Sequence, residues 1–186
     1  MHKLTRNVVF AILGTGLMSG GAWADDDTYG WIEKARVESL GAIAKAKLDS
    51  GALTSSINAK EIERFERDGE DWVRFTLTLE DEESDEMVAE ELERPVYRDL
   101  TVRGAGGKEE RPVVLLKLCM GKTIHEEQFS LNDRSDMIYP VLLGRRTIQH
   151  LGKIDVTRTF MHDPECDDDS PVQAHDEQET DEDIGA

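Results

Sequence analysis

Apolar and polar residues alternate with a period of two in several short segments of this chain, and glycines separate many of these segments. The clearest example is residues 72–79 (WVRFTLTL), in which every second residue is apolar. This period belongs to half-buried β-strands rather than to helices. Further strands are predicted at residues 31–40, 43–48, 93–102, 111–120, 123–131, 137–143 and 153–160. One short helix is predicted over residues 145–151, before Gly152. The sequence therefore predicts a small closed all-β barrel with one short helix, between about residues 30 and 161.

Three segments do not fit this alternation. In residues 58–68, Ile62 and Phe65 stand three apart among charged residues, which favours one or two helical turns or a polar connection. Residues 80–91 are mostly acidic and have too little apolar surface to offset the entropy of ordering them, so we expect an exposed acidic insertion. Residues 163–186 contain no Lys or Arg and are dense in Asp and Glu, which predicts a disordered acidic C-terminal tail.

The first 24 residues have the order of a secretory signal peptide. Lys3 and Arg6 form a basic region, an apolar run follows over residues 8–17, and Ala22-Trp23-Ala24 is a small-x-small cleavage site. The apolar run is shorter than the ~20 residues that span a bilayer, so we expect no stable membrane insertion. These features predict a mature chain that starts at Asp25, with a folded domain over residues 25–162, in the periplasm or secreted.

The charge and the cysteines limit the partners and the redox chemistry. A net charge of -18 repels nucleic acid and gives cationic partners or substrates an advantage in association rate. In an exported chain Cys119 and Cys166 can form a disulfide. A buried thiol at Cys119 with a free or intermolecular thiol at Cys166 fits the sequence equally well.

Asp49 differs in context from the many other acidic residues. It follows a predicted strand directly, and the small residues Ser50, Gly51 and Ala52 come next. Two carboxylates held close together share one proton, and such a pair can activate water while donating a hydrogen bond to a carbonyl. An ordinary β-turn is the other interpretation of Asp-Ser-Gly.

The chain resembles the retropepsin-like aspartic proteases, and more closely a bacterial group often labelled "ATP-dependent zinc proteases". The segments that carry the resemblance are GWIEKARVESLG, AKLDSGALTSSINA, WVRFTL, FSLNDRSDMIYPVLLGRR and IDVTRTF, in this order over about residues 30–160. The resemblance implies a retropepsin-like barrel in which Asp49 is the catalytic aspartate of an endopeptidase. It also implies an active-site loop of Ser50, Gly51 and Ala52, a flap hairpin at Gly104, Gly106 and Gly107, and support from Gly144 and Arg145. Because the chain has one Asp-Ser-Gly triplet, a two-aspartate site requires a homodimer with a peptide or protein substrate.

Metal and cofactor signals are weak in this sequence. His125, His150, His162, Cys119 and Cys166 do not stand at metal-ligand spacings, and there is no Walker motif, so we expect no metal and no cofactor. Two alternatives to the aspartic protease remain. One is a non-catalytic barrel that binds an extended peptide or a cell-envelope ligand, and the other is a zinc-dependent hydrolase. Arg134, Asp136 and Tyr139 form either a purely structural turn or a part of the site.

Overall fold

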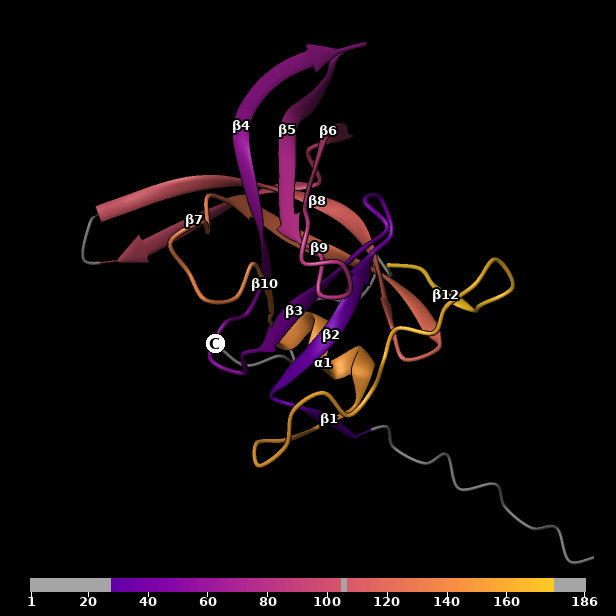
Figure 1. Ribbon diagram of the computed structural model, residues 1–186. Coiled ribbons are helices and arrows are strands. Elements are labelled where there is room, and N and C mark those ends of the chain that lie inside the picture. Colours follow the sequence, from indigo (N-terminus) through magenta and orange to yellow (C-terminus); the bar gives the residue numbers. More distant parts are fainter. Residues whose placement is uncertain (1–27, 105–106, 176–186) are drawn as a thin grey trace, which may run out of the picture.

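The computed structural model describes residues 28–104 and 107–175 (Figure 1). The expected signal peptide, residues 1–24, lies outside the described residues. The strands are β1 (Thr28–Gly30), β2 (Ile32–Val37), β3 (Ala42–Leu48), β4 (Ser55–Arg67), β5 (Glu70–Glu80), β6 (Met87–Pro95), β7 (Arg98–Gly104), β8 (Gly107–Met120), β9 (Thr123–Asn132), β10 (Val141–Leu143), β11 (Lys153–Asp155) and β12 (Val172–Gln173), and the helix is α1 (Arg145–Leu151). No helix within these residues is long and apolar enough to cross a membrane.

Six strands form a closed barrel. The order is β9-β8-β2-β3-β10-β4, and the parallel pairing of Ser55–Asn58 in β4 with Phe129–Asn132 in β9 closes the ring. Helix α1 follows β10 and packs against β10 and β4. The predicted small closed all-β barrel with one short helix is thereby confirmed, and α1 begins and ends where the sequence indicated.

The interior of the barrel follows the period-two pattern. In β3, Ala44, Ala46 and Leu48 are buried, whereas Lys45 and Lys47 on the opposite face are partly exposed. Successive side chains of a strand point to opposite faces, so one strand supplies both core and surface. The large side chains of Phe129 and Leu118 belong to the same core, and Phe75 of β5 packs into it from the neighbouring sheet.

Strand β4 leaves the barrel at a β-bulge and forms a second sheet with β5 and β6. The register with β5 shifts between Lys60 and Glu63, and Glu61 has a positive φ of 52°. A bulge inserts one extra residue into a strand. Beyond it, Ile62 packs against the hydrophobic core and Phe65 contacts Trp72 on the opposite face, as residues three apart in a strand do. The expected helical turn or connection at 58–68 is wrong, because these residues continue a strand.

The segment 80–91 is largely exposed, as expected of an acidic insertion, but its second half is an ordered strand. Residues 87–91 belong to β6, which pairs with β5 from Trp72↔Pro95 to Glu80↔Met87. Backbone hydrogen bonds and the ion pair of Arg74 with Glu93 (2.7 Å) order this polar strand, although Leu92 is its one buried residue. The edge of β5 offers a row of backbone hydrogen-bonding groups to a neighbouring strand, and these groups order β6 despite its small apolar surface.

Two strands are shorter than their periodicity indicates. Only Val141–Leu143 of the predicted 137–143 strand, and Lys153–Asp155 of 153–160, are strands. The predicted 93–102 strand is divided between β6 and β7.

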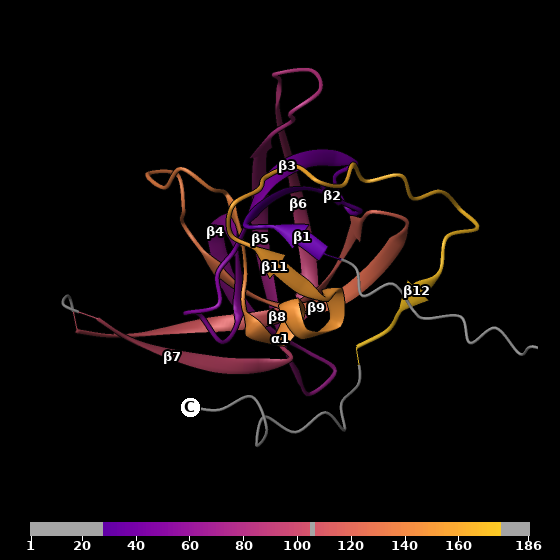
Figure 2. The ribbon, with the colours of Figure 1, turned by 90° about the horizontal axis from the view of Figure 1, so that it is seen from below.

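Strands β7 and β8 form a long hairpin at the glycine-rich segment. The pairing runs from Arg98↔Val113 to Gly104↔Gly107, and Gly107 has a φ of 113° that favours glycine. Figures 1 and 2 show the hairpin projecting from the barrel on the side where the loop between β3 and β4 lies. Gly106 lies outside the described residues.

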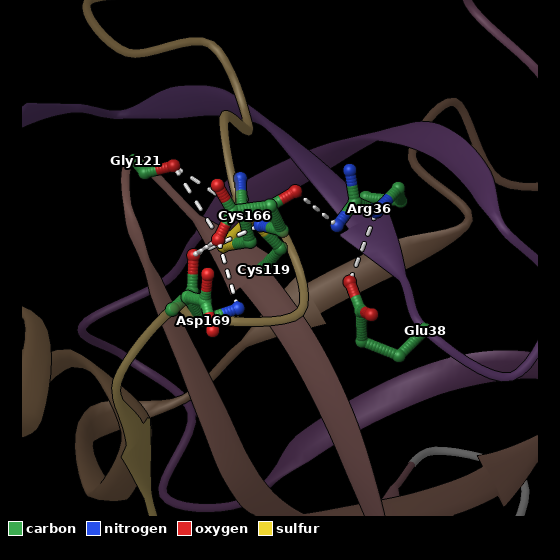
Figure 3. Close-up of a disulfide and its surroundings, with 8 residues drawn as sticks. Arg36, Glu38, Cys119, Gly121, Cys166 and Asp169 are labelled. Atoms are coloured by element: carbon green, nitrogen blue, oxygen red, sulfur yellow. Dashed lines mark hydrogen bonds and ion pairs between the residues drawn. A yellow bond between two sulfur atoms is a disulfide. The ribbon is translucent and has the colours of Figure 1, made fainter.

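Residues 161–175, called here the C-terminal strap, run across the outside of the barrel. Cys166 and Cys119 form a disulfide across a sequence separation of 47 residues, and Arg36 Nη2 donates to the Cys166 carbonyl at 2.9 Å (Figure 3). Farther along, β12 pairs in parallel with Ile124 and His125 of β9. The structure differs here from the expected disorder of residues 163–186, since 163–175 have defined partners. Residues 176–186 lie outside the described residues.

The buried carboxylate of Glu33 connects the segment before β2 with the segment that follows β11. Glu33 accepts hydrogen bonds from the backbone N–H groups of Gly30 (2.6 Å), Met161 (3.0 Å) and His162 (3.1 Å). Its exposed fraction is 0%. Because a buried charge is costly without hydrogen bonds, these three donors explain how a glutamate is tolerated there.

Candidate active site

Asp49 lies at the first position after β3, where β10 inserts between β3 and β4. Strand β10 runs parallel to β3 and antiparallel to β4. The Asp49 backbone N–H donates to the Leu143 carbonyl at 2.8 Å, and the Ala52 N–H donates to the Asp49 carbonyl at 3.1 Å. Backbone hydrogen bonds therefore hold the loop that carries Asp49 both to β10 and within its own turn.

The Asp49 carboxylate is partly exposed and has two close donors. Lys47 Nζ lies 3.0 Å from Oδ2, and the Gly51 N–H donates to Oδ1 at 3.0 Å. The Asp49 side chain is 27% exposed, which leaves it accessible from solvent. The Lys47 hydrogen bond is the main cause that lowers the pKa of Asp49, with a smaller contribution from Gly51, while partial burial acts in the opposite direction.

The segment that starts α1 supports the Asp49 loop from behind. The Arg145 N–H donates to the Ala52 carbonyl at 2.9 Å, and Arg145 Nη1 donates to the Ser50 carbonyl at 2.9 Å. A Cβ on Gly144 would lie 2.7 Å from the backbone of Leu53 and Thr54, so this close approach requires glycine. The structure thus brings Asp49, Ser50, Gly51, Ala52, Gly144 and Arg145 together.

A buried polar network that the sequence did not reveal lies beneath this loop. Ser55 Oγ accepts from the Gly144 N–H at 3.0 Å and lies 2.7 Å from Thr147 Oγ1. Thr147 in turn donates to Glu127, whose other oxygen lies 2.7 Å from His150 Nδ1. The hydroxyl-rich run after Leu53 was the one available signal, and its partners come from β9 and α1, far away in sequence.

Basic side chains gather around the same loop. Arg98 Nη2 (2.9 Å) and Arg146 Nη1 (2.5 Å) both donate to Thr54 Oγ1. Arg134 is 8% exposed, and its guanidinium donates to the Tyr139 carbonyl. Burial lowers the pKa of Arg134, the nearby charge of Arg111 lowers it further, and the charge of Asp49 raises it.

The sequence left open whether Arg134, Asp136 and Tyr139 belong to the site, and in the structure Arg134 is the central residue of the 133–140 turn. Its N–H donates to Asn58 Oδ1 at 2.7 Å, and Nη1 lies 3.5 Å from Ser56 Oγ. Asp136 is exposed at the loop surface. The Tyr139 ring packs edge-on against Trp31, whose carbonyl accepts from Leu48 beside Asp49.

The candidate metal ligands do not converge. Cys119 and Cys166 are joined to each other, His150 is bonded to Glu127, and His162 Nε2 lies 3.0 Å from the Thr28 carbonyl. Within residues 28–104 and 107–175, no group of three His, Cys, Asp or Glu side chains has a metal-binding arrangement.

A cavity of about 740 Å³ opens on the outer face of the molecule. Its lining includes Arg94, Tyr97, Leu115 and Glu126, and none of its lining residues belongs to the Asp49 loop. Since Asp49 combines a partly exposed carboxylate with a fixed loop, the chemistry points to Asp49 rather than to this cavity.

Residues 28–165 match a family model described as RimB-like, "Retropepsin-like aspartic endopeptidase RimB". Two curated relatives are each named "Probable alpha-L-glutamate ligase". The protein from Desulfotalea psychrophila is 35% identical over 105 residues, which are 56% of this chain and 22% of the relative. The protein from Shewanella pealeana is 32% identical over 117 residues, which are 62% of this chain and 25% of the relative. The chain thus spans about a quarter of the length of these relatives.

A solved structure shares the fold. The crystal structure of protein Lpg0085 from Legionella pneumophila, described as of unknown function, superposes with a TM-score of 0.60 and 30% identity. The match covers 72% of this chain and 96% of Lpg0085.

Proposed function

Because this chain belongs to the RimB-like family of retropepsin-like aspartic endopeptidases, we propose that it hydrolyses peptide bonds with a water molecule activated by Asp49 from each of two chains. The observation that carries the proposal is the Asp49 loop itself. It presents a partly exposed carboxylate on a backbone that β10 and the start of α1 hold in place.

In this reaction the two Asp49 carboxyl groups hold one proton between them. The ionised group takes a proton from water, whose oxygen attacks the peptide carbonyl carbon, while the protonated group donates to the carbonyl oxygen. The C–N bond then breaks as the amine nitrogen receives a proton, and the pair returns to its starting state. The β7–β8 hairpin would close over the substrate as a flap.

The proposed two-aspartate site requires a homodimer, since the chain contains one Asp-Ser-Gly triplet. One carboxylate can act as a general base, but proton sharing needs a second carboxylate nearby. The active species should therefore depend on protein concentration.

We propose an acidic peptide, rich in Glu or Asp, as the substrate class. Lys47, Arg98, Arg134, Arg145 and Arg146 surround the Asp49 loop, although the whole chain carries a net charge of -18. A local cluster of one sign governs which peptides the site attracts. The name of the curated relatives, which contains glutamate, agrees with this class. Local charge thus outweighs the preference for cationic substrates that the net charge indicates.

A non-catalytic peptide-binding barrel is the second candidate, and the Lys47–Asp49 ion pair favours it. A lysine at 3.0 Å keeps Asp49 ionised and opposes the sharing of a proton between two aspartates. Such a barrel would bind an acidic peptide without cleaving it.

A cleavage assay separates the two candidates. The chain should cleave an oligoglutamate-containing peptide more rapidly than an oligolysine peptide, and Asp49→Asn should abolish cleavage without lowering peptide affinity. Asp136→Asn, an exposed acid in the neighbouring loop, is the matched control and should retain activity. Specific activity should also fall on dilution. Cleavage at the parental rate by Asp49→Asn would refute the aspartic mechanism, and binding without cleavage by the unaltered chain would favour the second candidate.

A further inference from the structure

We propose that residues 176–186 of this chain bind its own Asp49 site as an intramolecular pseudosubstrate. This inference rests on the acidic-peptide class proposed above. The segment reads DEQETDEDIGA, with six acidic residues, no basic residue, and one large apolar side chain at Ile184. It has the composition of the peptide that the site is proposed to recognise.

The C-terminal strap holds the start of this segment in a defined place. The Cys119–Cys166 disulfide and the β12–β9 pairing fix the strap to the barrel. The last described residue, His175, packs its ring edge-on against Tyr97 at 5.0 Å between centroids, and its Nε2 lies 3.0 Å from the Tyr97 hydroxyl. Tyr97 directly precedes β7, the first strand of the proposed flap.

A short series of contacts leads from His175 to the Asp49 loop. His175 Nε2 lies 3.3 Å from Gln128 Nε2, and Gln128 Oε1 accepts from Arg98 Nε at 2.7 Å. Arg98 Nη2 then donates to Thr54 Oγ1 at 2.9 Å. These side chains place the origin of the segment within two side-chain lengths of the loop. Eleven extended residues reach about 35 Å, which is more than this gap requires.

Charge complementarity selects the Asp49 face as the surface for this segment. Arg98 stands at its origin and Lys47, Arg134 and Arg145 stand farther along, beside the carboxylate. At the opposite end of β3, the turn after β5 presents the acidic residues Glu83, Asp85 and Glu86, which repel the segment.

Tethering makes even weak binding effective. A short flexible linker gives an effective concentration of about 1 mM, so a segment with an intrinsic Kd of about 0.1 mM would occupy the site most of the time. Because the tethered segment competes for the site, a free acidic peptide would then bind about tenfold more weakly than it would to a site without this segment.

The test uses the full chain with Asp49→Asn, so that nothing is cleaved, and a fluorescent synthetic peptide of residues 176–186 as probe. In the chain that also carries Asp181→Asn, Glu182→Gln and Asp183→Asn, the Kd measured by anisotropy should fall about tenfold. The matched control neutralises Glu83, Asp85 and Glu86 in the same way and should change the Kd less than about twofold.

Three results would overturn the inference: an unchanged Kd in the tail-neutralised chain, an equal fall in the control, or no probe binding to either chain. The outcome is separable from that for the protease. Cleavage by the chain with Asp49 restored, together with an unchanged probe Kd, overturns the pseudosubstrate alone. A tenfold fall in Kd without any cleavage overturns the protease alone.

Discussion

Reduction of the Cys119–Cys166 disulfide should lower the free energy of unfolding by about 4 kcal/mol. The bond closes a loop with a sequence separation of 47 residues. In the chain-entropy description, a loop of this length removes about 4 kcal/mol of conformational freedom from the unfolded state. Both cysteines are buried, at 0% and 8% exposure, so the thiols should stay in place and the folded state should change little.

Urea unfolding with and without a phosphine reductant, followed by tryptophan fluorescence and circular dichroism, measures this change. With a slope of about 2 kcal/mol per molar urea, the midpoint should fall by about 2 M. Cys166→Ser is the control, because the reductant should leave its midpoint unchanged. If the midpoint of the unaltered chain moves by less than about 0.5 M on reduction, the disulfide of the strap adds no stability beyond that of the barrel, and the reasoning is refuted.

Three other substitutions test the Asp49 site and the hydrogen bonds of Glu33. Lys47→Gln should raise the pKa of Asp49 toward its ordinary value and move the acidic limb of the kcat/KM profile to higher pH, whereas Lys45→Gln should not. The stability that comes from the lowered pKa of Asp49 is present above the pKa of the unfolded state. It is lost as the pH falls through the pKa of the folded state. Gly144→Ala should lower the thermal midpoint through a cost of about 1–3 kcal/mol, since the new Cβ meets rigid backbone at 2.7 Å, and an unchanged midpoint would contradict the close approach. Glu33→Ala should lower the free energy of unfolding in urea by several kcal/mol, because three backbone donors lose their acceptor. Glu33→Gln should lower it less, and equal losses for the two variants would count against the hydrogen bonds.

The parts of the fold that the sequence predicted are those specified locally. The alternation in β5 and the Gly152 stop after α1 depend on neighbouring residues, and both were located correctly. The Asp49 loop was found for the same reason, because Asp-Ser-Gly-Ala directly follows a strand. The structure adds the contacts of this loop with Gly144 and Arg145, whereas the catalytic role of Asp49 stays a prediction.

The errors arise where distant segments supply the order. Strand β6 is polar and gains its order from the β5 ladder, and the strap gains its order from a disulfide and from β9. Composition reflects only the apolar surface of the segment itself, so it led us to expect an exposed insertion at 80–91 and disorder at 163–186. The pairing of Glu127 with His150 likewise depends on how β9 lies against α1, which no local pattern encodes.

The pairing of β1 with β11 has a consequence for how this domain can travel between proteins. Thr28 lies opposite Lys153, and the Tyr29 and His162 rings are 4.6 Å apart, so the points where the chain joins and leaves the barrel are neighbours. A module with adjacent ends can be inserted into or appended to a larger polypeptide without forcing its host apart. In the curated relatives the matching region is about a quarter of the length. Glu33 would then hold the entering and leaving segments of the chain together, whatever is attached on either side.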